Sequence, residues 1–207
     1  MPGMPKSHRA GEKKLILASS SPRRRDLLKQ IGLRFEVMPS KVEESIKSGE
    51  DPVEHVLRLA EEKALDVGSN GKDSSIIAAD TIVLLNGEIL GKPATEEEAY
   101  QMLRKLSGKE HRVITGFCVF NTNTKECTRQ SVETTVVIKE LSEREINGYV
   151  KTKEPFDKAG GYAIQGIGSF MVKEIRGSYT NVVGLPICEL VEVLQRLGAI
   201  DIFDGVS

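Results

Sequence analysis

Apolar positions along the chain recur at two spacings, in short continuous runs typical of buried strands and at the three-to-four-residue spacing typical of helices. The run from Lys14 to Ala18 predicts a strand. After it, Ser21 suits the N-cap of a helix, Pro22 suits the first helical position, and Gly32 suits the left-handed residue that follows the last turn. This part of the chain is therefore predicted to form a strand, a serine-rich loop and a helix.

The same alternation of strands and helices continues downstream and indicates an α/β fold. Further strands are predicted around Phe35–Met38, over "SIIAAD" ending at Asp80, over His111–Phe120 and Thr128–Ile138, and near Phe170–Ile175. Helices are predicted from Asp51 to about Gly68, from Thr95 to about Leu106, from Ser142 onward, and from Pro186 to Leu197. In "TIVLLNGEIL", the pair Asn86-Gly87 predicts a hairpin with a two-residue type I′ turn.

No internal repeat, low-complexity tract or shift in composition divides the chain, so residues 14–207 are expected to form one domain. The glycine-rich segment "DKAGGYAIQGIG" is predicted to be an ordered loop, because apolar and charged residues are interleaved with its glycines. Residues 1–13 are polar and lack an apolar core, so they are expected to be a disordered leader and not a signal peptide.

Charge and cysteine content narrow the class of protein. The formal net charge is −1, which gives no global electrostatic reason to bind nucleic acid or a membrane. The three cysteines are widely spaced, which argues against a disulfide framework and a structural zinc site and suits a reducing cytosol. No apolar run approaches the ~20 residues that a membrane-spanning helix needs. A soluble cytoplasmic protein is expected.

The serine-rich loop and the helix after it form a candidate phosphate site. Arg23, Arg24 and Arg25 occupy the first turn, where the helix dipole is positive and acidic side chains are preferred. Free backbone N–H groups, serine hydroxyls and guanidinium groups all bind phosphate oxygens, and a bound anion would remove this conflict. The alternative is an ordinary helix start whose arginines point into water, and this stretch alone leaves both open.

Carboxylates supply the second element of a candidate site. Asp80 is predicted at the end of a strand, where open α/β sheets usually hold their ligands, although a solvated aspartate would look the same. Glu43 and Glu44 follow a strand and are candidates to share a divalent cation with Asp80, or else form a solvated pair. Three further candidates have ordinary explanations: Lys63 and Lys92 as surface lysines, and Gln165 as a backbone cap. In the glycine-rich segment, Asp157 and Lys158 have an ordinary explanation too, since they can pair with each other.

Eight motifs occur in an order that resembles the Maf family of nucleoside triphosphate pyrophosphatases: "LILASSSPRRRDLL", "KVEES", "LAEEKA", "AADTIV", "LGKP", "LRKLSGKEH", "TKEPFDKAGGYAIQG" and "VVGLP". The resemblance runs from Lys14 to about Leu197. It implies an elongated ITPase-like α/β fold, with a central mixed β-sheet flanked by helices, a cleft between two lobes, and commonly a homodimer. It also implies hydrolysis of nucleoside triphosphates to the monophosphate and pyrophosphate with magnesium, manganese or cobalt.

The resemblance assigns roles to residues of this chain. It implies that Asp80 is the catalytic proton acceptor and that Glu44 is a functional carboxylate, which with Asp80 is expected to hold the metal. It implies phosphate-binding roles for Ser19, Ser21, Arg23, Arg24, Lys63 and Lys92.

Three positions separate the subfamilies that the resemblance brings in. This chain has Arg23, Thr81 and Gln165, the set of the dTTP/UTP pyrophosphatases, whereas a group associated with 7-methyl-GTP tends to have Trp, Gln and Glu there. The expected function is thus hydrolysis of dTTP and UTP in keeping the nucleotide pool clean, with a possible link to arrest of cell division. The alternatives are a pyrophosphatase for modified purine nucleotides and a non-catalytic regulator of septum formation. The charge pattern predicts no stable complex with nucleic acid.

Overall fold

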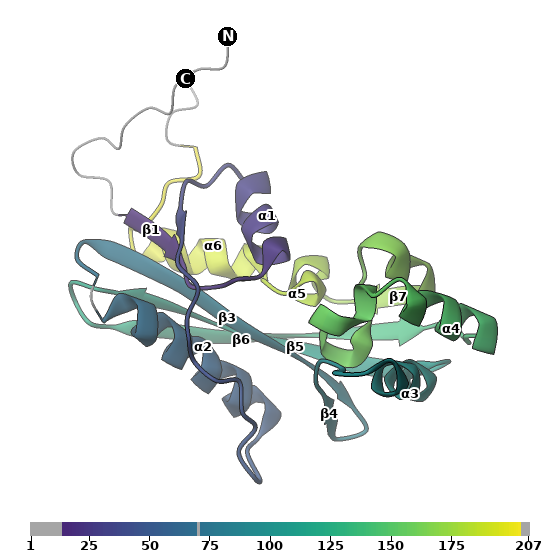
Figure 1. Cartoon of the computed structure of the whole chain (residues 1–207). Coiled ribbons are helices and arrows are strands. Elements are labelled where there is room, and N and C mark those ends of the chain that lie inside the picture. Colours follow the sequence, from purple (N-terminus) through teal and green to yellow (C-terminus); the bar gives the residue numbers. More distant parts are fainter. Residues whose placement is uncertain (1–13, 70, 204–207) are drawn as a thin grey trace.

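The computed structural model describes residues 14–69 and 71–203, so the leader predicted for residues 1–13 lies outside the described residues. Figure 1 shows the following elements in chain order: β1 (Lys14–Leu17), α1 (Pro22–Gln30), β2 (Glu36–Val37), α2 (Pro52–Gly68), β3 (Ser74–Leu85), β4 (Glu88–Leu90), α3 (Glu96–Leu106), β5 (Glu110–Asn121), β6 (Cys127–Ile138), α4 (Glu143–Lys151), three short 3-10 helices (Glu154–Asp157, Ala159–Gly161 and Gly166–Met171), β7 (Val172–Arg176), α5 (Tyr179–Val183) and α6 (Ile187–Arg196).

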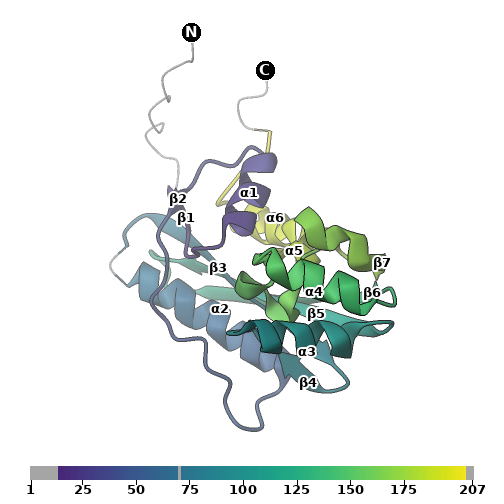
Figure 2. The same cartoon turned by 45° about the vertical axis from the view of Figure 1, so that its right-hand side comes forward.

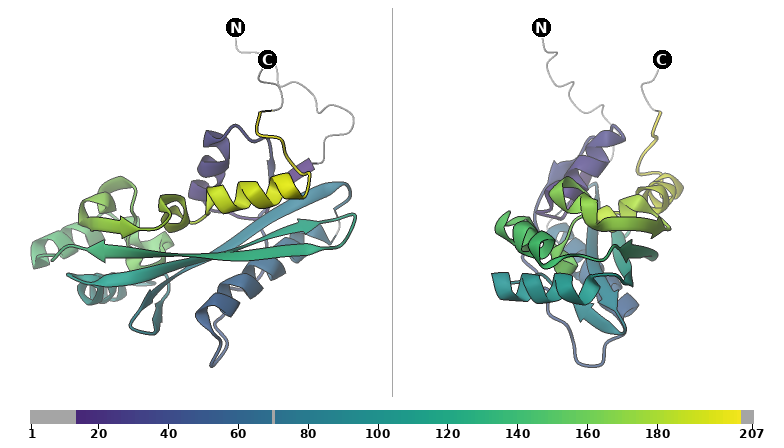
Figure 3. Two further views of the ribbon diagram at one scale, coloured as in Figure 1. Left: turned by 180° about the vertical axis from the view of Figure 1, so that it is seen from behind. Right: turned by 90° about the vertical axis from the view of Figure 1, so that its right-hand side faces the viewer.

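The strands of the described residues form one mixed sheet in the order β2-β1-β3-β5-β6-β7, with β4 paired to β3. Strand β1 runs parallel to β2 and β3, and the other pairs are antiparallel. Strands β3, β5 and β6 have 12 residues each, about 40 Å at the rise of a strand, and they run along the length of the molecule (Figure 3). The predicted α/β class, a mixed sheet flanked by helices, is confirmed.

Two lobes share these long strands. In the first lobe, α2 covers one face of the sheet while α1 and α6 cover the other, with apolar side chains of β3 and β5 buried on both sides (Figures 1 and 2). In the second lobe, α3, α4 and the 3-10 segments enclose a separate core that includes Leu103, Ile146, Tyr149 and Met171. The middle parts of these long strands therefore form the floor of the space between the two lobes.

Local sequence signals place most of the element ends correctly. The predicted N-caps Ser21, Asp51, Thr95 and Ser142 each accept a hydrogen bond from a backbone N–H in the first turn of their helix. At the predicted type I′ turn, Asn86 and Gly87 both have positive φ, 51° and 85°. Gly32 has φ of 75° after α1, as expected for the residue that ends a helix.

One prediction about the elements was wrong, and one element was missed. The segment ending at Asp80 and the first strand of the predicted hairpin are one continuous strand, β3, so Asp80 lies in mid-strand and not at a strand end. A carboxylate inside a buried strand is rare unless it is paired, and Asp80 is tolerated there because Lys63 reaches it from α2. Helix α5 was not predicted, since five residues are too few to display a helical period.

Candidate active site

The site is built on a gap in one edge of β3. Strand β1 pairs with β3 as far as Ile77, and β4 pairs with it only from Val83, so no strand covers the edge between them. Successive residues of a strand point to opposite faces, so Asp80 faces α2 while Thr81 faces the side of α1 and α6. The gap brings both faces of the sheet into one cavity of about 510 Å³.

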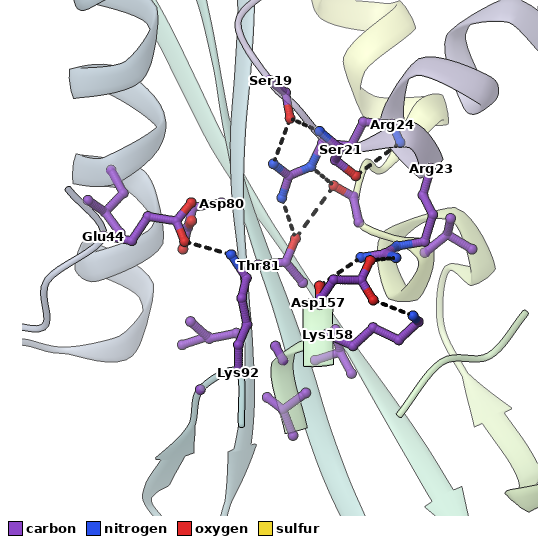
Figure 4. Close-up of a pocket in the computed structure, with 18 of the residues that line it drawn as sticks. Ser19, Ser21, Arg23, Arg24, Glu44, Asp80, Thr81, Lys92, Asp157 and Lys158 are labelled. Carbon is purple, nitrogen blue, oxygen red and sulfur yellow. Dashed lines mark hydrogen bonds and ion pairs between the residues drawn. The ribbon is translucent and has the colours of Figure 1, made fainter. Parts of the chain in front are cut away.

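Every residue that the sequence proposed for the site lines this cavity except Glu43 and Arg25, and Figure 4 labels most of them. They come from the loop after β1, from α1, the segment after β2, α2, β3, the turn after β4 and the glycine-rich segment: Ser19, Ser21, Arg23, Arg24, Glu44, Lys63, Asp80, Thr81, Lys92 and Gln165. The fold therefore gathers residues that are up to 146 positions apart in the sequence, Ser19 and Gln165 being the extremes.

One wall of the cavity carries alternating carboxylates and lysines. The Nζ atom of Lys63 lies 2.7 Å from Oδ1 of Asp80 and 2.6 Å from Oε1 of Glu44, and Lys92 Nζ lies 2.8 Å from the other oxygen of Glu44. Partial burial acts to raise the pKa of Glu44, but hydrogen bonds from the two ammonium groups outweigh it and hold the pKa at about 2. Glu44 is thus ionised at neutral pH, with both lysines already in place.

A glycine allows α2 to bring Lys63 this close. Gly116 of β5 is the cross-strand partner of Asp80, and a Cβ added there would lie 2.6 Å from the carbonyl carbon of Val56 in α2. Val56 and Lys63 are seven positions apart, so they lie on the same face of the helix, two turns from each other. Close contact at Gly116 therefore seats the helix face from which Lys63 reaches Asp80.

The segment that carries Glu44 is joined to α2 by partly buried and exposed polar contacts. Arg58 donates from Nε to Oε1 of Glu50 at 2.5 Å and from Nη2 to the carbonyl oxygen of Ser45 at 3.1 Å, while Nδ1 of His55 lies 2.9 Å from Glu50. The hydrogen bonds from Arg58 hold the pKa of Glu50 at about 2, against the opposing effect of burial. This arrangement fixes residues 44–50 beside the cavity.

Arg24 fills the gap in the edge of β3. Its Nη1 donates to the carbonyl oxygen of Ala79 at 2.8 Å, its Nε to the carbonyl oxygen of Gly184 at 2.7 Å, and its Nη2 to Oγ1 of Thr81 at 3.0 Å. A further contact of 3.4 Å joins Nη1 to Oγ of Ser19. Burial lowers the pKa of this guanidinium, and the charges of the nearby carboxylates only partly oppose the effect. Arg24 thus takes the hydrogen-bonding place of an absent strand.

The other arginines of the first turn are also paired with protein groups. Arg23 donates from Nη1 to Oδ2 of Asp157 at 2.7 Å, and Lys158 Nζ lies 2.5 Å from Oδ1 of the same carboxylate. The pairing of Asp157 with Lys158, which the sequence suggested as their ordinary explanation, is therefore present. Arg25 lies outside the cavity and contacts Asp26. Groups from other chain segments thus offset the unfavourable interaction with the helix dipole for Arg23 and Arg24, two of the three arginines.

Gln165 lies on the cavity side of the glycine-rich segment and does not cap the 3-10 helix that follows it. That segment is held by the carboxylate of Glu154, which accepts hydrogen bonds from the backbone N–H groups of Ile167 and Gly168 at 3.1 and 3.0 Å. The hydroxyl of Tyr149 donates to the same carboxylate at 3.0 Å. Gln165 is therefore presented from a backbone that is fixed on the side of the second lobe.

The charges that line the cavity suit a polyanion. Five cations (Arg23, Arg24, Lys63, Lys92 and Lys158) face three carboxylates (Glu44, Asp80 and Asp157), which leaves a net charge of about two positive. Asp157 and Lys158 have no role that the sequence indicates, because a neighbouring pair of opposite charge has no signal beyond its own pairing. Their position across the cavity from Lys92 is seen only in the folded chain (Figure 4).

A family model described as "Maf-like protein" matches residues 14–197. The chain belongs to the Maf family. Among its relatives, proteins described as "dTTP/UTP pyrophosphatase" from Syntrophus aciditrophicus and Caldicellulosiruptor saccharolyticus are 49% and 50% identical to it, over 90% of this chain and 91% and 96% of theirs. A protein of the same description from Clostridioides difficile is 46% identical over 93% of this chain and 99% of its own.

A solved structure described as a HAM1 protein from Coxiella burnetii has 15% sequence identity and a TM-score of 0.49, and the match covers 88% of this chain and 98% of that one. Residues 14–69 and 71–203 of this Maf chain contain no group of three or more His, Cys, Asp or Glu side chains placed to hold a metal ion. In the same residues, no helix has both the length and the apolar character needed to cross a membrane.

Proposed function

We propose that this Maf protein hydrolyses nucleoside triphosphates to the monophosphate and pyrophosphate, with dTTP and UTP as its best substrates. The observation that carries the proposal is a cavity that a carboxylate in mid-strand, Asp80, lines together with five cations. Relatives described as dTTP/UTP pyrophosphatases, about half identical to this chain over nearly its whole length, support the choice of substrate. The set Arg23, Thr81 and Gln165 supports the same choice.

Asp80 is proposed to orient the attacking water and to accept its proton. Its Oδ1 is engaged by Lys63, so the second carboxylate oxygen is the one available to the water. General-base catalysis contributes about 10²–10⁴-fold to such reactions. The cations of the two walls would bind the phosphate oxygens and stabilise the charge that develops on the leaving pyrophosphate.

A divalent metal ion, magnesium, manganese or cobalt, is proposed as cofactor, held by Asp80 and Glu44. The donor set fits an ion that arrives with its substrate: two carboxylates contact the same Lys63, and the described residues supply no third ligand of the His, Cys, Asp or Glu type. Magnesium commonly takes one or two carboxylates plus phosphate oxygens and waters. When bound, the ion would neutralise phosphate oxygens and lower the pKa of coordinated water.

The charge balance agrees with this proposal. A triphosphate with one divalent cation carries about two negative charges at neutral pH, which matches the net positive charge of the side chains that line the cavity. Gln165 offers both a donor and acceptors for the carbonyl and N3–H edge of a pyrimidine base. A site that hydrogen-bonds its base discriminates against bases that leave those groups unpaired.

The test is release of pyrophosphate from a panel of dTTP, UTP, CTP, ATP and GTP, with and without each metal. We expect metal-dependent release that is fastest with dTTP and UTP. No release from any of them would refute the enzymatic proposal and favour a non-catalytic regulator, whereas equal release from all five would refute only the preference for dTTP and UTP. Including 7-methyl-GTP in the panel tests the remaining alternative.

We also propose that the enzyme works as a homodimer in the cytoplasm, as the family resemblance implies. Several large apolar side chains are exposed on the second lobe, among them Ile167 and Phe170, at 56% and 42% of their full accessible area. Exposed apolar surface of this kind suits a subunit contact. Analytical ultracentrifugation of the purified chain tests the assembly, and a monomer at micromolar concentration would refute it.

A further inference from the structure

Behind the cavity lies a buried threonine to which nothing so far gives a role. Thr115 on β5 is the direct cross-strand partner of Thr81 on β3, and their Oγ1 atoms are 2.9 Å apart. Thr115 is completely buried and does not line the cavity, whereas Thr81 does. A buried hydroxyl must be hydrogen-bonded to be tolerated, so the partners of these two groups can be followed one by one.

The donor and acceptor in each of these hydrogen bonds can be assigned because a hydroxyl group donates only one hydrogen bond. A threonine hydroxyl has one proton, and that of Thr115 goes to the carbonyl oxygen of Asn181 at 3.1 Å. Thr115 must then accept from Thr81. The other acceptor near Thr81, the carbonyl oxygen of Gly184, is 3.5 Å away and already accepts from Arg24 Nε at 2.7 Å. Thr81 therefore donates to Thr115 and accepts from Arg24 Nη2 at 3.0 Å.

The far end of this chain of bonds is firmly anchored. Asn181 is completely buried, and its Nδ2 donates to the carbonyl oxygen of Val113 at 3.1 Å and to Oγ1 of Thr134 at 2.9 Å. These two contacts fix α5 against β5 and β6. The sheet thus holds in place the carbonyl oxygen of Asn181, which accepts the hydrogen bond from Thr115.

The other end of this chain of hydrogen bonds is Arg24, a cation of the candidate site, and most of its N–H groups already have an acceptor. Of the five N–H groups of Arg24, one on Nε, two on Nη1 and one on Nη2 point to Gly184, to Ala79 and Ser19, and to Thr81. Within the part of the chain that the structure describes, this leaves one N–H, on Nη2. A guanidinium group is planar and rigid, so the bond to Thr81, together with those to Gly184 and Ala79, fixes the plane of the whole group and hence the direction of the remaining N–H.

We propose that Thr115 and Thr81 are positioning residues that aim the remaining N–H of Arg24 at a phosphate oxygen. The hydroxyl of Thr81 donates its one hydrogen bond to Thr115 and accepts one from Arg24, so it links the buried Thr115 to this guanidinium. This inference rests on the proposed function for the identity of the ligand, an oxygen of a phosphate or pyrophosphate group. It gives residue 81 an influence on substrate use that passes through Arg24.

The test compares Thr81→Val, Thr115→Val and the double variant, with Thr122→Val as the matched control. Thr122 is also a buried threonine beside the end of β5, and its hydroxyl donates to the carbonyl oxygen of Ser74 at 3.0 Å, far along the strand from the cavity. Two quantities are measured for each: the Kd of pyrophosphate by calorimetry, and kcat/KM for dTTP, UTP and CTP.

We expect Thr81→Val and Thr115→Val each to weaken pyrophosphate binding about tenfold, the effect of losing one hydrogen bond to a charged group. The double variant should be no weaker than either single one, since both break the same chain of bonds. The ratio of dTTP to CTP turnover should stay unchanged in Thr115→Val, because Thr115 does not line the cavity. Thr115→Ser, which keeps the hydroxyl, should restore wild-type affinity, and Thr122→Val should match the wild type.

Three results would overturn the proposal. One is a Thr115→Val variant that binds pyrophosphate like Thr122→Val, and another is additive losses in the double variant. The third is a change of the dTTP to CTP ratio in Thr115→Val, which would mean that the two threonines act on the choice of base and not on Arg24 alone. If Thr115→Val does not fold, Thr81→Val against Thr81→Ser makes the same comparison. Failure of the wild type to release pyrophosphate would refute the proposed function, while the calorimetric arm would still decide this inference.

Discussion

Replacing Arg23 and Arg24 one at a time by alanine separates ligand binding from support of the fold. The two residues are adjacent, carry the same charge and line the same cavity, but their partners differ. Arg23 pairs with Asp157, whose side chain is 59% exposed, while Arg24 donates to backbone carbonyl oxygens of Ala79 and Gly184 inside the protein. Both variants should lose triphosphate turnover, and only one should lose stability.

The size of the difference follows from these partners. An exposed ion pair contributes about 0–1 kcal/mol to the free energy of unfolding, so Arg23→Ala should cost little. Arg24→Ala leaves two buried carbonyl oxygens without their donor, at about 1–3 kcal/mol each, or about 2–6 kcal/mol in total. With a urea m-value of about 2 kcal/mol/M, this corresponds to a fall of about 1–3 M in the unfolding midpoint.

Urea unfolding followed by circular dichroism measures the midpoints, and pyrophosphate release measures turnover in the absence of urea. Arg25→Ala, which removes an exposed arginine from the same helical turn outside the cavity, is the control and should change neither quantity. Equal midpoints for the Arg23 and Arg24 variants would refute the reasoning, because they would mean that the edge of β3 does not depend on Arg24 for its hydrogen bonds.

The remaining predictions concern catalysis, base choice and pH. Asp80→Asn should lower kcat by about 10²–10⁴-fold while the chain still unfolds cooperatively, since Lys63 keeps its contact with Glu44; a kcat within a few-fold of wild type would remove Asp80 from the role of base. Gln165→Glu should selectively slow dTTP hydrolysis by about 1–3 kcal/mol in kcat/KM, and an equal loss on ATP would contradict base reading. Burial lowers the pKa of His111 to about 4, below the ordinary value near 6.5, so the unfolded chain binds a proton that the folded chain does not. The free energy of unfolding should therefore fall as pH drops from about 6.5 to 4, and His111→Gln should flatten that part of the stability curve measured in urea.

Sequence patterns predicted the elements well wherever a local signal existed. Ser21, Asp51, Thr95 and Ser142 marked helix starts because a cap is a contact between residues two or three positions apart. The middle of β3 was mistaken for an end because a charged residue in a strand normally signals exposure. Its burial depends on Lys63, a residue 17 positions away whose partner no local pattern can reveal.

The candidate site shows the same division. The family resemblance suggested which side chains belong together, and the structure places them around one cavity. The contacts that organise them were not predictable, since they join positions as distant as Arg24 and Gly184, or Thr115 and Asn181. Gly116 is another example, because its lack of a side chain allows α2 to lie close to the sheet. A single glycine inside a strand does not reveal which segment packs against it.

The long strands determine how the cavity can open and close. Enzymes that close by a hinge rotate two bodies about a few unpaired residues, but β3, β5 and β6 pass through both lobes in unbroken ladders of hydrogen bonds. Such a rotation would have to break those ladders, so these strands stay rigid. The parts that move are the two rims of the cavity, which are residues 44–50 on one side and the glycine-rich segment on the other. Each rim is held by an ion pair: Glu44 pairs with Lys63, and Asp157 pairs with Arg23. A phosphate group would compete with these carboxylates for the two cations. Substrate entry would thus release the rims separately, and amide exchange in these two segments, not in the strands, would respond to nucleotide.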